Sequence, residues 1–378
     1  MAFLPYGKQT LDEEDVQAVL ETLRSDWLTT GPEVEKFEKC LAEKSGARYA
    51  VAMNSGTAAL HAAYFAAGVG PGDEVITSPI TFAATANAAL YMGARPVFAD
   101  IRKDTININP EGLEKHIRPR TKVIAPVDFA GHPADLDAVL SIARENGLIV
   151  VEDAAHSLGA AYKGRPVGSL ADITIFSFHP VKHVTTGEGG AVVTNDKGYY
   201  EKMLAFRSHG IVREKDKLTE YHGPWYHEMQ HLGYNYRLTD IQCALGISQL
   251  KKLTSFLEKR QALVDFYNRE LSSLDIDTPV NLAEVIPAWH LYVIRLKGPK
   301  PPRREIYEEL HRAGIGVQVH YLPVYWHPYY QELGYAKGLC PAAEDYYWRA
   351  LSLPLFPSMS MDDANRVCRE LKRIISKK

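Results

Sequence analysis

The sequence predicts an α/β protein in which helices cover both faces of a mainly parallel sheet of seven strands. Between about residues 48 and 197, short β-rich runs alternate with Ala-rich or amphipathic stretches, and this alternation is typical of βαβ units. After about residue 260 the chain mixes short strands with helices. A length of 378 residues exceeds what one hydrophobic core usually serves, so we expect a large domain over 1–250 and a smaller C-terminal α+β domain over 251–378.

The expected strands are short runs rich in β-branched and aromatic residues. They are Tyr49–Met53, Glu74–Thr77, Pro96–Phe98, Val123–Val127, Leu148–Val151, Ile173–Phe178 and Ala191–Thr194. Helices between them are expected at Thr57–Ala67, Ala83–Tyr91 and Leu136–Asn146.

The flanking segments are expected to add further elements. Near the start, Thr10 and Glu13 have the spacing of a capping box, which predicts a short helix before Asp26. After the sheet we expect helices at Asp240–Glu258 and Arg304–Arg312, strands at Leu291–Leu296 and Gly316–Tyr321, and a last helix with Val367, Leu371 and Ile374 on one face.

Composition excludes several classes of protein. The net charge of −3 gives no basic surface for nucleic acid or an anionic membrane. We find no signal peptide and no apolar run near the roughly 20 residues of a transmembrane helix, so we expect a cytoplasmic protein. The four cysteines, Cys40, Cys243, Cys340 and Cys368, lie far apart without metal-ligand spacing. We therefore expect reduced, mostly buried thiols and no metal.

The most informative stretch for function is Ile173–Gly190, where an apolar strand ends in polar, glycine-rich sequence around Lys182. Ligands of open α/β sheets collect at the carboxyl ends of the strands. A lysine desolvated there loses its proton more readily and can form an imine with an aldehyde cofactor. An isolated loop lysine is usually a solvated charge, so the inference depends on the residues around it.

A second strand, Leu148–Asp153, ends at two carboxylates. Asp153 beside a protonated pyridine nitrogen would keep that ring cationic and able to accept electrons; the alternative is a helix cap or a structural ion pair. Ala155 is small enough for a flat ring to lie against the chain. His156 could hydrogen-bond a ring hydroxyl, although a core histidine would look the same in sequence.

A third strand turns directly into a helix through Ser55, Gly56 and Thr57. Free N–H groups at a helix N-terminus form a ready phosphate site. Ser177 offers another hydroxyl, and Phe82 could stack on a ring or belong to the core. A phosphate site, a pyridine-nitrogen acid and a lysine at successive strand ends together favour pyridoxal phosphate (PLP) as the cofactor.

At these residues the sequence resembles the DegT/DnrJ/EryC1/StrS sugar aminotransferase family, and the likeness runs from Trp27 to about Pro354. The resemblance implies the PLP-dependent transferase fold of type I and amino transfer from glutamate to a nucleotide-linked keto-sugar. The matching segments are Trp27–Pro32, Asn54–Ala58, Val75–Pro79, Glu152–His156, Phe176–His179, Thr186–Gly190, Tyr234–Arg237 and Val319–Tyr321.

The resemblance also implies roles for individual residues. Lys182 would form the imine with PLP and shuttle protons, and Asp153 would pair with the pyridine nitrogen. Asn235 would reach the phosphate from the neighbouring subunit, so the active unit would be a homodimer with shared sites. With the residues singled out above, the expected cofactor-binding set is Ser55, Gly56, Thr57, Phe82, Asp153, Ala155, His156, Ser177, Lys182 and Asn235.

Two segments, Ser25–Pro32 and Gln318–Val324, look most like the pseudaminic-acid branch of the family. The enzyme of that branch aminates C4 of a UDP-linked 2-acetamido-2,6-dideoxy-4-hexulose, with glutamate as the usual donor. His183 is a loop position that could touch substrate or only solvent. The candidate substrate contacts are Thr30, Gly31, His183, His320 and Tyr321.

Three other classes of protein would each need a feature that this sequence lacks. A nicotinamide-dependent sugar oxidoreductase needs Gly-x-Gly-x-x-Gly after the first strand, which the sequence lacks. A PLP-binding regulator of DNA would need an added helix-turn-helix domain, for which no length is left. A serine hydrolase would need Gly-x-Ser-x-Gly, which is also missing. Another nucleotide-linked sugar, aminated at C3 or C4, stays open because pocket shape decides it.

Overall fold

The computed structural model describes residues 2–376 and contains a seven-stranded sheet in the order β1-β9-β8-β5-β4-β2-β3. Strands β8, β5, β4, β2 and β3 run parallel, whereas β9 pairs antiparallel with both β8 and β1. The predicted mainly parallel sheet is therefore confirmed. Its strands are β1 (Tyr49–Met53), β2 (Glu74–Thr77), β3 (Arg95–Phe98), β4 (Thr121–Ala125), β5 (Ile149–Asp153), β8 (Ile173–Ser177) and β9 (Gly190–Thr194).

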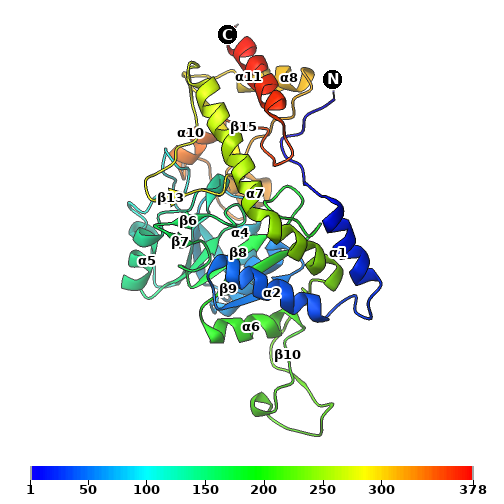
Figure 1. The fold of residues 1–378 in the computed structure, drawn as a ribbon. Helices are drawn as coiled ribbons and strands as arrows, with labels where there is room; N and C mark the ends of the chain where they lie inside the picture. Colours follow the sequence, from blue (N-terminus) through cyan, green and yellow to red (C-terminus); the bar gives the residue numbers. More distant parts are fainter. Residues whose placement is uncertain (1, 377–378) are drawn as a thin grey trace.

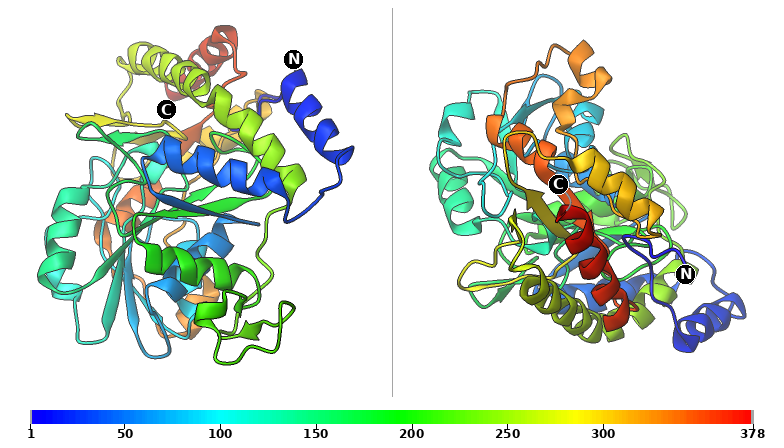
Figure 2. Two further views of the ribbon diagram at one scale, coloured as in Figure 1. Left: turned by 60° about the horizontal axis from the view of Figure 1, so that its bottom comes forward. Right: turned by 90° about the horizontal axis from the view of Figure 1, so that it is seen from above.

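Helices cover both faces of this sheet, as Figure 2 shows for α2 and α6. Helices α3 (Gly56–Ala66), α4 (Ala84–Tyr91) and α6 (Lys197–Arg207) contribute to one apolar cluster with alternate strand residues. Helices α2 (Pro32–Ser45) and α5 (Leu136–Glu145) pack against the opposite face. Because both faces are buried, the middle of each strand is apolar, and the charged residues of these strands stand at or near the strand ends.

Helix α7 (Asp240–Leu271) links the sheet to the C-terminal part of the chain (Figure 1). Its N-terminus is fixed by a capping box between Thr239 and Gln242. The prediction ended this helix at Glu258, which is wrong, because its second half continues into the C-terminal core with Leu263, Tyr267 and Leu271. The division into 1–250 and 251–378 falls inside α7 and stays a prediction.

The C-terminal part has an antiparallel sheet of β12 (Ile276–Asp277), β14 (Tyr292–Leu296) and β15 (Ala350–Leu353). Helices α8 (Arg303–Arg312) and α11 (Met361–Ile375) share its apolar core. The expected strand at Gly316–Tyr321 is wrong: only an isolated bridge joins Gln318 to Ser352. After Gln318 the chain leaves the small C-terminal sheet and runs to the seven-stranded sheet. There Val324 N donates to Pro79 O, just after β2.

The first helix, α1 (Glu13–Leu23), begins one residue after Asp12, whose side chain forms a capping box with Asp15. The predicted Thr10–Glu13 box is therefore wrong. Lys252 binds both Asp12 and Asp15, which holds these carboxylates at the helix start. The remaining elements are β6 (Ala161–Tyr162), β7 (Arg165–Pro166), β10 (Ile211–Val212), β11 (Glu228–Met229), β13 (Val285–Ile286), α9 (Pro328–Glu332) and α10 (Pro341–Arg349), with short 3₁₀ turns at Glu114–His116, Phe129–Gly131, Lys215–Lys217 and Val324–Trp326.

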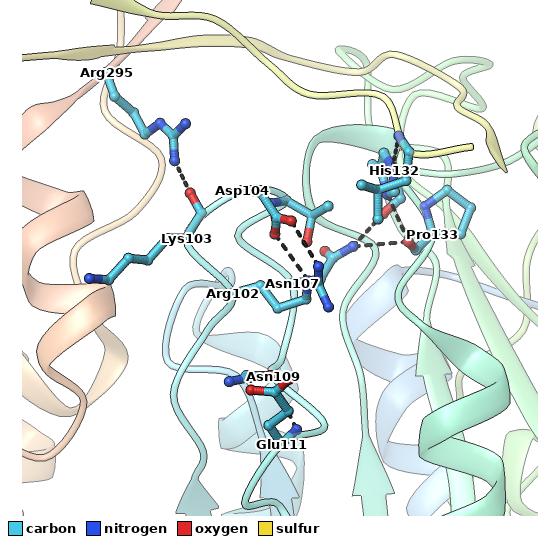
Figure 3. A network of polar contacts seen from close by, with 11 residues as sticks. Arg102, Lys103, Asp104, Asn107, Asn109, Glu111, His132, Pro133 and Arg295 are labelled. Carbon is cyan, nitrogen blue, oxygen red and sulfur yellow. Dashed lines mark hydrogen bonds and ion pairs between the residues drawn. The ribbon is translucent and has the colours of Figure 1, made fainter. Parts of the chain in front are cut away.

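A buried asparagine braces the loops at the carboxyl ends of β3 and β4. Asn107 Nδ2 donates to the carbonyls of His132 at 2.8 Å and Pro133 at 3.0 Å (Figure 3). In the same loop Asp128 N donates to Asp153 O at 3.1 Å. The end of β5 that carries Asp153 is thus tied to its neighbours.

Within residues 2–376, no helix is long and apolar enough to cross a membrane. No group of three or more His, Cys, Asp and Glu side chains in that range could hold a metal ion. The four cysteines are free; Cys243, Cys340 and Cys368 are buried and Cys40 is partly buried, which agrees with the predicted thiols.

Candidate active site

A cavity of about 580 Å³ opens at the carboxyl ends of the parallel strands. Asp153 enters it from the end of β5 and Ser177 from the end of β8. The C-terminal part closes one side with the segment Gln318–Tyr321. The cavity therefore lies where an open α/β sheet is expected to bind ligands.

Most of the predicted site residues line this cavity, although they come from segments far apart in sequence. They are Ser55, Gly56, Thr57, Phe82, Asp153, Ala155, His156, Ser177, Lys182, His320 and Tyr321. The predicted residues that do not line it are Thr30, Gly31, His183 and Asn235.

Lys182 and Asp153 are the basic and acidic groups at the centre of the site. Loss of hydration on burial lowers the pKa of the Lys182 amine to about 8, although the negative charge of Asp153 acts to raise it. Burial raises the pKa of the Asp153 carboxyl, although hydrogen bonds from Thr85 and Ala155 and the charge of Lys182 act in the opposite direction. A lysine whose pKa is lowered in this way has an available free amine near neutral pH.

The Asp153 carboxylate is held in a fixed orientation by two donors. Thr85 Oγ1 donates to Asp153 Oδ2 at 2.6 Å, and the backbone N–H of Ala155 donates to Oδ1 at 3.2 Å. Thr85 is in turn 2.8 Å from the hydroxyl of Thr81. A carboxylate oriented toward a cavity can bind a cationic ring nitrogen.

The N-terminus of α3 forms a cradle opposite Ser177. The hydroxyl of Ser55 accepts from Ala58 N at 3.0 Å and caps the helix, while the N–H groups of Gly56 and Thr57 belong to the first turn and have no intrahelical acceptor. A Cβ atom at Gly56 would stand 3.1 Å from Ser177 Cβ and 3.3 Å from its Oγ. Glycine therefore keeps the space that a phosphate needs there.

His156 is a buried neutral imidazole in the cavity wall. Its Nε2 is 3.3 Å from the Tyr321 hydroxyl, and its ring centroid is 4.4 Å from that of His290. Burial, with the charge of Lys182, lowers the His156 pKa well below its usual value. The buried Nδ1 has no partner among residues 2–376. A free ring nitrogen, a phosphate cradle, an acid and a lysine in one cavity fit PLP.

Phe82 and His320 line the cavity from different parts of the chain. Phe82 precedes α4 and stays 64% exposed, with its ring edge-on to Tyr321 at 6.5 Å between centroids. His320 is fixed by a contact of 2.8 Å between its Nδ1 and Ser352 Oγ. An exposed aromatic face at a cavity mouth is available to stack on a flat ring.

The remaining predicted residues lie elsewhere within this chain. His183 is buried, 2.8 Å from the carbonyl of Ala288 through its Nε2, and so contacts neither solvent nor the cavity. Thr30 and Gly31 lie at the start of α2, where Gly31 N donates to Asp240. Asn235 is exposed at the surface.

Sequence reasoning missed several cavity residues. Thr81 lies just before the predicted helix at Ala83–Tyr91 and Thr85 lies within it, four residues later, a helical spacing that could have drawn attention to both. His179, Glu188 and Gln318 belong to segments that the resemblance singled out, which was a signal for them. Tyr6 and His290 carry no local signal, because only folding brings them near Lys182. The missed polar residues are Tyr6, Thr81, Thr85, His179, Glu188, His290 and Gln318.

Comparison with known proteins gives consistent matches along nearly the whole chain. A model of the DegT/DnrJ/EryC1/StrS aminotransferase family matches residues 9–372. The chain is 44% identical to the spore coat polysaccharide biosynthesis protein SpsC of Bacillus subtilis, covering 99% of this chain and 97% of that protein. It is 41% identical to a UDP-4-amino-4,6-dideoxy-N-acetyl-beta-L-altrosamine transaminase of Campylobacter jejuni, covering 99% and 98%.

Solved structures agree with these matches. Helicobacter pylori PseC, described as an aminotransferase involved in the biosynthesis of pseudoaminic acid, has a TM-score of 0.93 at 36% identity, with both chains covered completely (100%). The PLP form of a putative sugar aminotransferase, Spr1654 of Streptococcus pneumoniae, has a TM-score of 0.93 at 32% identity, with 99% of each chain covered.

Proposed function

The chain belongs to the DegT/DnrJ/EryC1/StrS aminotransferase family and is a PLP-dependent sugar aminotransferase; from this premise we propose that it transfers the amino group of glutamate to C4 of a UDP-linked 2-acetamido-2,6-dideoxy-4-hexulose, a step of pseudaminic acid biosynthesis. The observation that carries amino transfer is the meeting of Lys182, Asp153 and the Gly56 cradle in one cavity. The Campylobacter and Helicobacter relatives support the choice of sugar.

A second candidate is amination of another nucleotide-linked 3- or 4-keto-sugar. It is favoured by SpsC, which is 44% identical to this chain, against 41% for the altrosamine transaminase. The nicotinamide-dependent oxidoreductase considered from the sequence is excluded by membership of an aminotransferase family.

When bound, PLP supplies an aldehyde that accepts amino groups and a ring that withdraws electrons from the carbon losing its proton. Lys182 would hold the cofactor and, once released, take the α-proton of glutamate at its Nζ. In the second half of the reaction the same amine would return a proton to the sugar carbon. A Lys182 pKa of about 8 suits both taking and returning a proton, because the amine then gains and loses its proton readily near neutral pH.

Asp153 would face the pyridine nitrogen, with Thr85 and Ala155 N–H keeping its carboxylate in place. A protonated ring nitrogen would oppose the desolvation that raises the Asp153 pKa, so the acid would stay ionised. The aspartate would thereby maintain the positive charge that makes the ring an electron acceptor.

The remaining cavity residues would position the cofactor. Gly56, Thr57 and Ser177 would bind its phosphate, with Ser55 as the helix cap behind them. Phe82 and Ala155 would lie on the two faces of the ring, and His156 Nδ1 would bind the ring hydroxyl. His320 and Tyr321, which the C-terminal part contributes to the cavity, would contact the sugar.

We further propose a homodimer in which Asn235 reaches the phosphate in the partner subunit. The arm that precedes it, including β10 and β11, projects from the body of the chain (Figure 1). The segment from β10 to residue 232 leaves large apolar side chains exposed: Trp225 is 72% accessible, Met229 66% and Leu232 77%. Burying such surface in a second copy would stabilise a dimer. Thr30 and Gly31 stay predicted substrate contacts that one chain does not bring to the cavity. His183 does not, because its ring is buried against the carbonyl of Ala288.

The test is product identification. Purified protein would be incubated with glutamate and a panel of nucleotide-linked 3- and 4-keto-sugars, and products would be identified by mass spectrometry and NMR. We expect a 4-amino product from the UDP-linked 2-acetamido-2,6-dideoxy-4-hexulose at the highest kcat/KM. A higher kcat/KM for another keto-sugar would replace the first proposal by the second, and no amino product from any of them would refute both.

A further inference from the structure

Two buried carboxyl groups, those of Asp128 and Glu152, lie next to Asp153 in the fold but do not line the cavity. Neither is paired with a lysine or arginine of residues 2–376. Glu152 Oε2 accepts from Thr174 Oγ1 at 2.8 Å, whereas its buried Oε1 has no hydrogen-bond donor among those residues. Two buried carboxylates without a cation would be too costly, so the pair must hold at least one proton.

Strands β4 and β5 bring the two carboxyl groups to the same face of the sheet. Val127 and Asp153 form a parallel bridge, and successive side chains of an extended chain point to opposite faces. Asp128 and Glu152, which adjoin that bridge, therefore both point away from the face of Asp153. Their side chains are within hydrogen-bonding contact of each other. Two carboxyl groups can form such a bond only when one of them carries a proton.

The donors around the pair indicate that Glu152 carries this proton. Asp128 accepts two hydrogen bonds, from Ser157 Oγ at 2.6 Å and from Ala134 N at 2.9 Å, which suits a carboxylate. Glu152 accepts only one from such a donor. Burial raises the pKa of both carboxyl groups, that of Glu152 well above its usual value, and the charge of Asp153 raises both further.

Asp128 begins a loop that contacts the cavity wall at three points. Its backbone N–H donates to Asp153 O at 3.1 Å, and its side chain holds Ser157, the residue after His156. The carbonyl two residues further along accepts from His290 N at 2.9 Å. All three of these neighbours that line the cavity would move with the loop: Asp153, His156 and His290.

We propose that Glu152 is a neutral carboxylic acid that donates a hydrogen bond to the Asp128 carboxylate, and that this bond positions Asp153, His156 and His290 in the cavity. Glu152 and Asp128 are positioning residues, because they act through residues that line the cavity. The bond breaks when Glu152 ionises, since the pair then has no proton to share. The protonation state is independent of the substrate, whereas the positioning role rests on the cofactor site described above.

Infrared spectroscopy of the apo-protein tests the protonation state without turnover. The C=O stretch of a carboxylic acid is separate from the bands of a carboxylate. At about pH 7, the difference between the spectra of wild type and Glu152→Gln should therefore contain an acid band. Glu145→Gln is the matched control, because Glu145 is exposed on α5 and should contribute carboxylate bands only. A wild-type minus Glu152→Gln spectrum with carboxylate bands alone would overturn the proposal.

The pH dependence of unfolding gives a second readout on the apo-protein. A carboxyl group whose folded-state pKa is raised, as for Glu152, stabilises fully below its unfolded pKa, and this stability is lost as the pH rises toward the folded pKa. Glutamine keeps a donor and does not titrate. The melting temperature of Glu152→Gln relative to wild type should thus increase from about pH 6 to about pH 9, while Glu145→Gln keeps a constant offset. A constant offset for Glu152→Gln would contradict the shared proton.

Cofactor binding tests the positioning role. Glu152→Met removes the donor to the buried Asp128 carboxylate, so the Kd for PLP should rise about 10- to 100-fold, and Glu152→Gln should restore most of the affinity. Equal affinity of Glu152→Met and wild type would refute the role. If Glu152→Met does not fold, Glu152→Gln decides: a Kd within about threefold of wild type supports the role, and a larger rise refutes it. A wild type that aminates no keto-sugar would refute the proposed function and leave the infrared and unfolding results unaffected.

Discussion

The hydroxyl of Thr85 donates a hydrogen bond of 2.6 Å to Asp153 Oδ2, joining the first turn of α4 to the end of β5. Both residues are buried, and the hydrogen bond lowers the Asp153 pKa against the larger effect of desolvation. An acid that must stay charged inside a protein depends on such donors. Thr85 is therefore a positioning residue for Asp153.

Replacing Thr85 by Val should impair the enzyme without unfolding it. A hydrogen bond to a charged group contributes roughly 1.5–3 kcal/mol, so we expect kcat/KM to fall about 10- to 100-fold. Thr85→Ser keeps the hydroxyl and should restore most of the activity. Because the lost donor lets the Asp153 pKa rise, activity of Thr85→Val should also decline at a higher pH on the acidic side than that of wild type. An unchanged acidic limb would contradict the positioning role.

Borohydride reduction should fix PLP to Lys182. Purified protein should be yellow, and peptide mapping after reduction should find the label on this lysine alone. Lys182→Ala should lose transamination. Lys197→Ala is the control, since Lys197 is 73% exposed at the start of α6 and pairs only weakly with Glu201 at 3.6 Å. A label on another lysine would refute the assignment.

The pH dependence of cofactor attachment follows from the lowered pKa of Lys182, about 8. The amine must be unprotonated to bond to the aldehyde, so attachment to the apo-protein should speed up about tenfold per pH unit below pH 8 and level off above it. A lysine with the ordinary pKa of about 10.4 would keep gaining rate through pH 9. Stopped-flow absorbance after mixing PLP with apo-protein measures this directly.

Gly56→Ala should weaken PLP binding by closing the cradle. The added Cβ would lie 3.1 Å from Ser177 Cβ, within a tightly packed strand end, so a phosphate could not approach the helix N-terminus as closely. Gly70→Ala is the matched control, because its Cβ would meet only Asp73 Oδ2 at 4.0 Å. Equilibrium titration of the apo-proteins should show at least a tenfold rise in Kd for the first variant and no change for the second.

The sequence predicts those parts of the fold and the site whose pattern lies within one short stretch of chain. Alternating apolar runs located the strands of the sheet, and the strand ends located Lys182, Asp153 and Gly56, because ligand sites follow strand ends. The contact of Thr85 with Asp153 spans 68 residues and could not be predicted from either segment. His183 directly follows Lys182, yet it turns away to Ala288, since neighbouring side chains in an irregular loop need not share a direction.

The C-terminal end of α7 was predicted too early for a different reason. Its first half faces the large sheet and its second half the C-terminal core, so no single apolar stripe runs along the helix. A prediction based on one helical face ends where the face changes, although good helix-forming residues continue.

The last prediction concerns Asn235, which is exposed and does not line the cavity of its own chain. If its amide donates to the phosphate in the partner subunit, Asn235→Ala should weaken PLP binding by about one to two orders of magnitude, because a hydrogen bond to a charged group contributes roughly 1.5–3 kcal/mol. Attachment to Lys182 should persist at saturating PLP. Mixing Lys182→Ala with a severely impaired Asn235 variant should restore activity, since one cavity of each heterodimer receives both intact residues from different chains. Subunit exchange is checked first with differently tagged chains. If heterodimers form and activity does not exceed the sum of the parents, or if the active protein sediments as a monomer, the shared site is refuted.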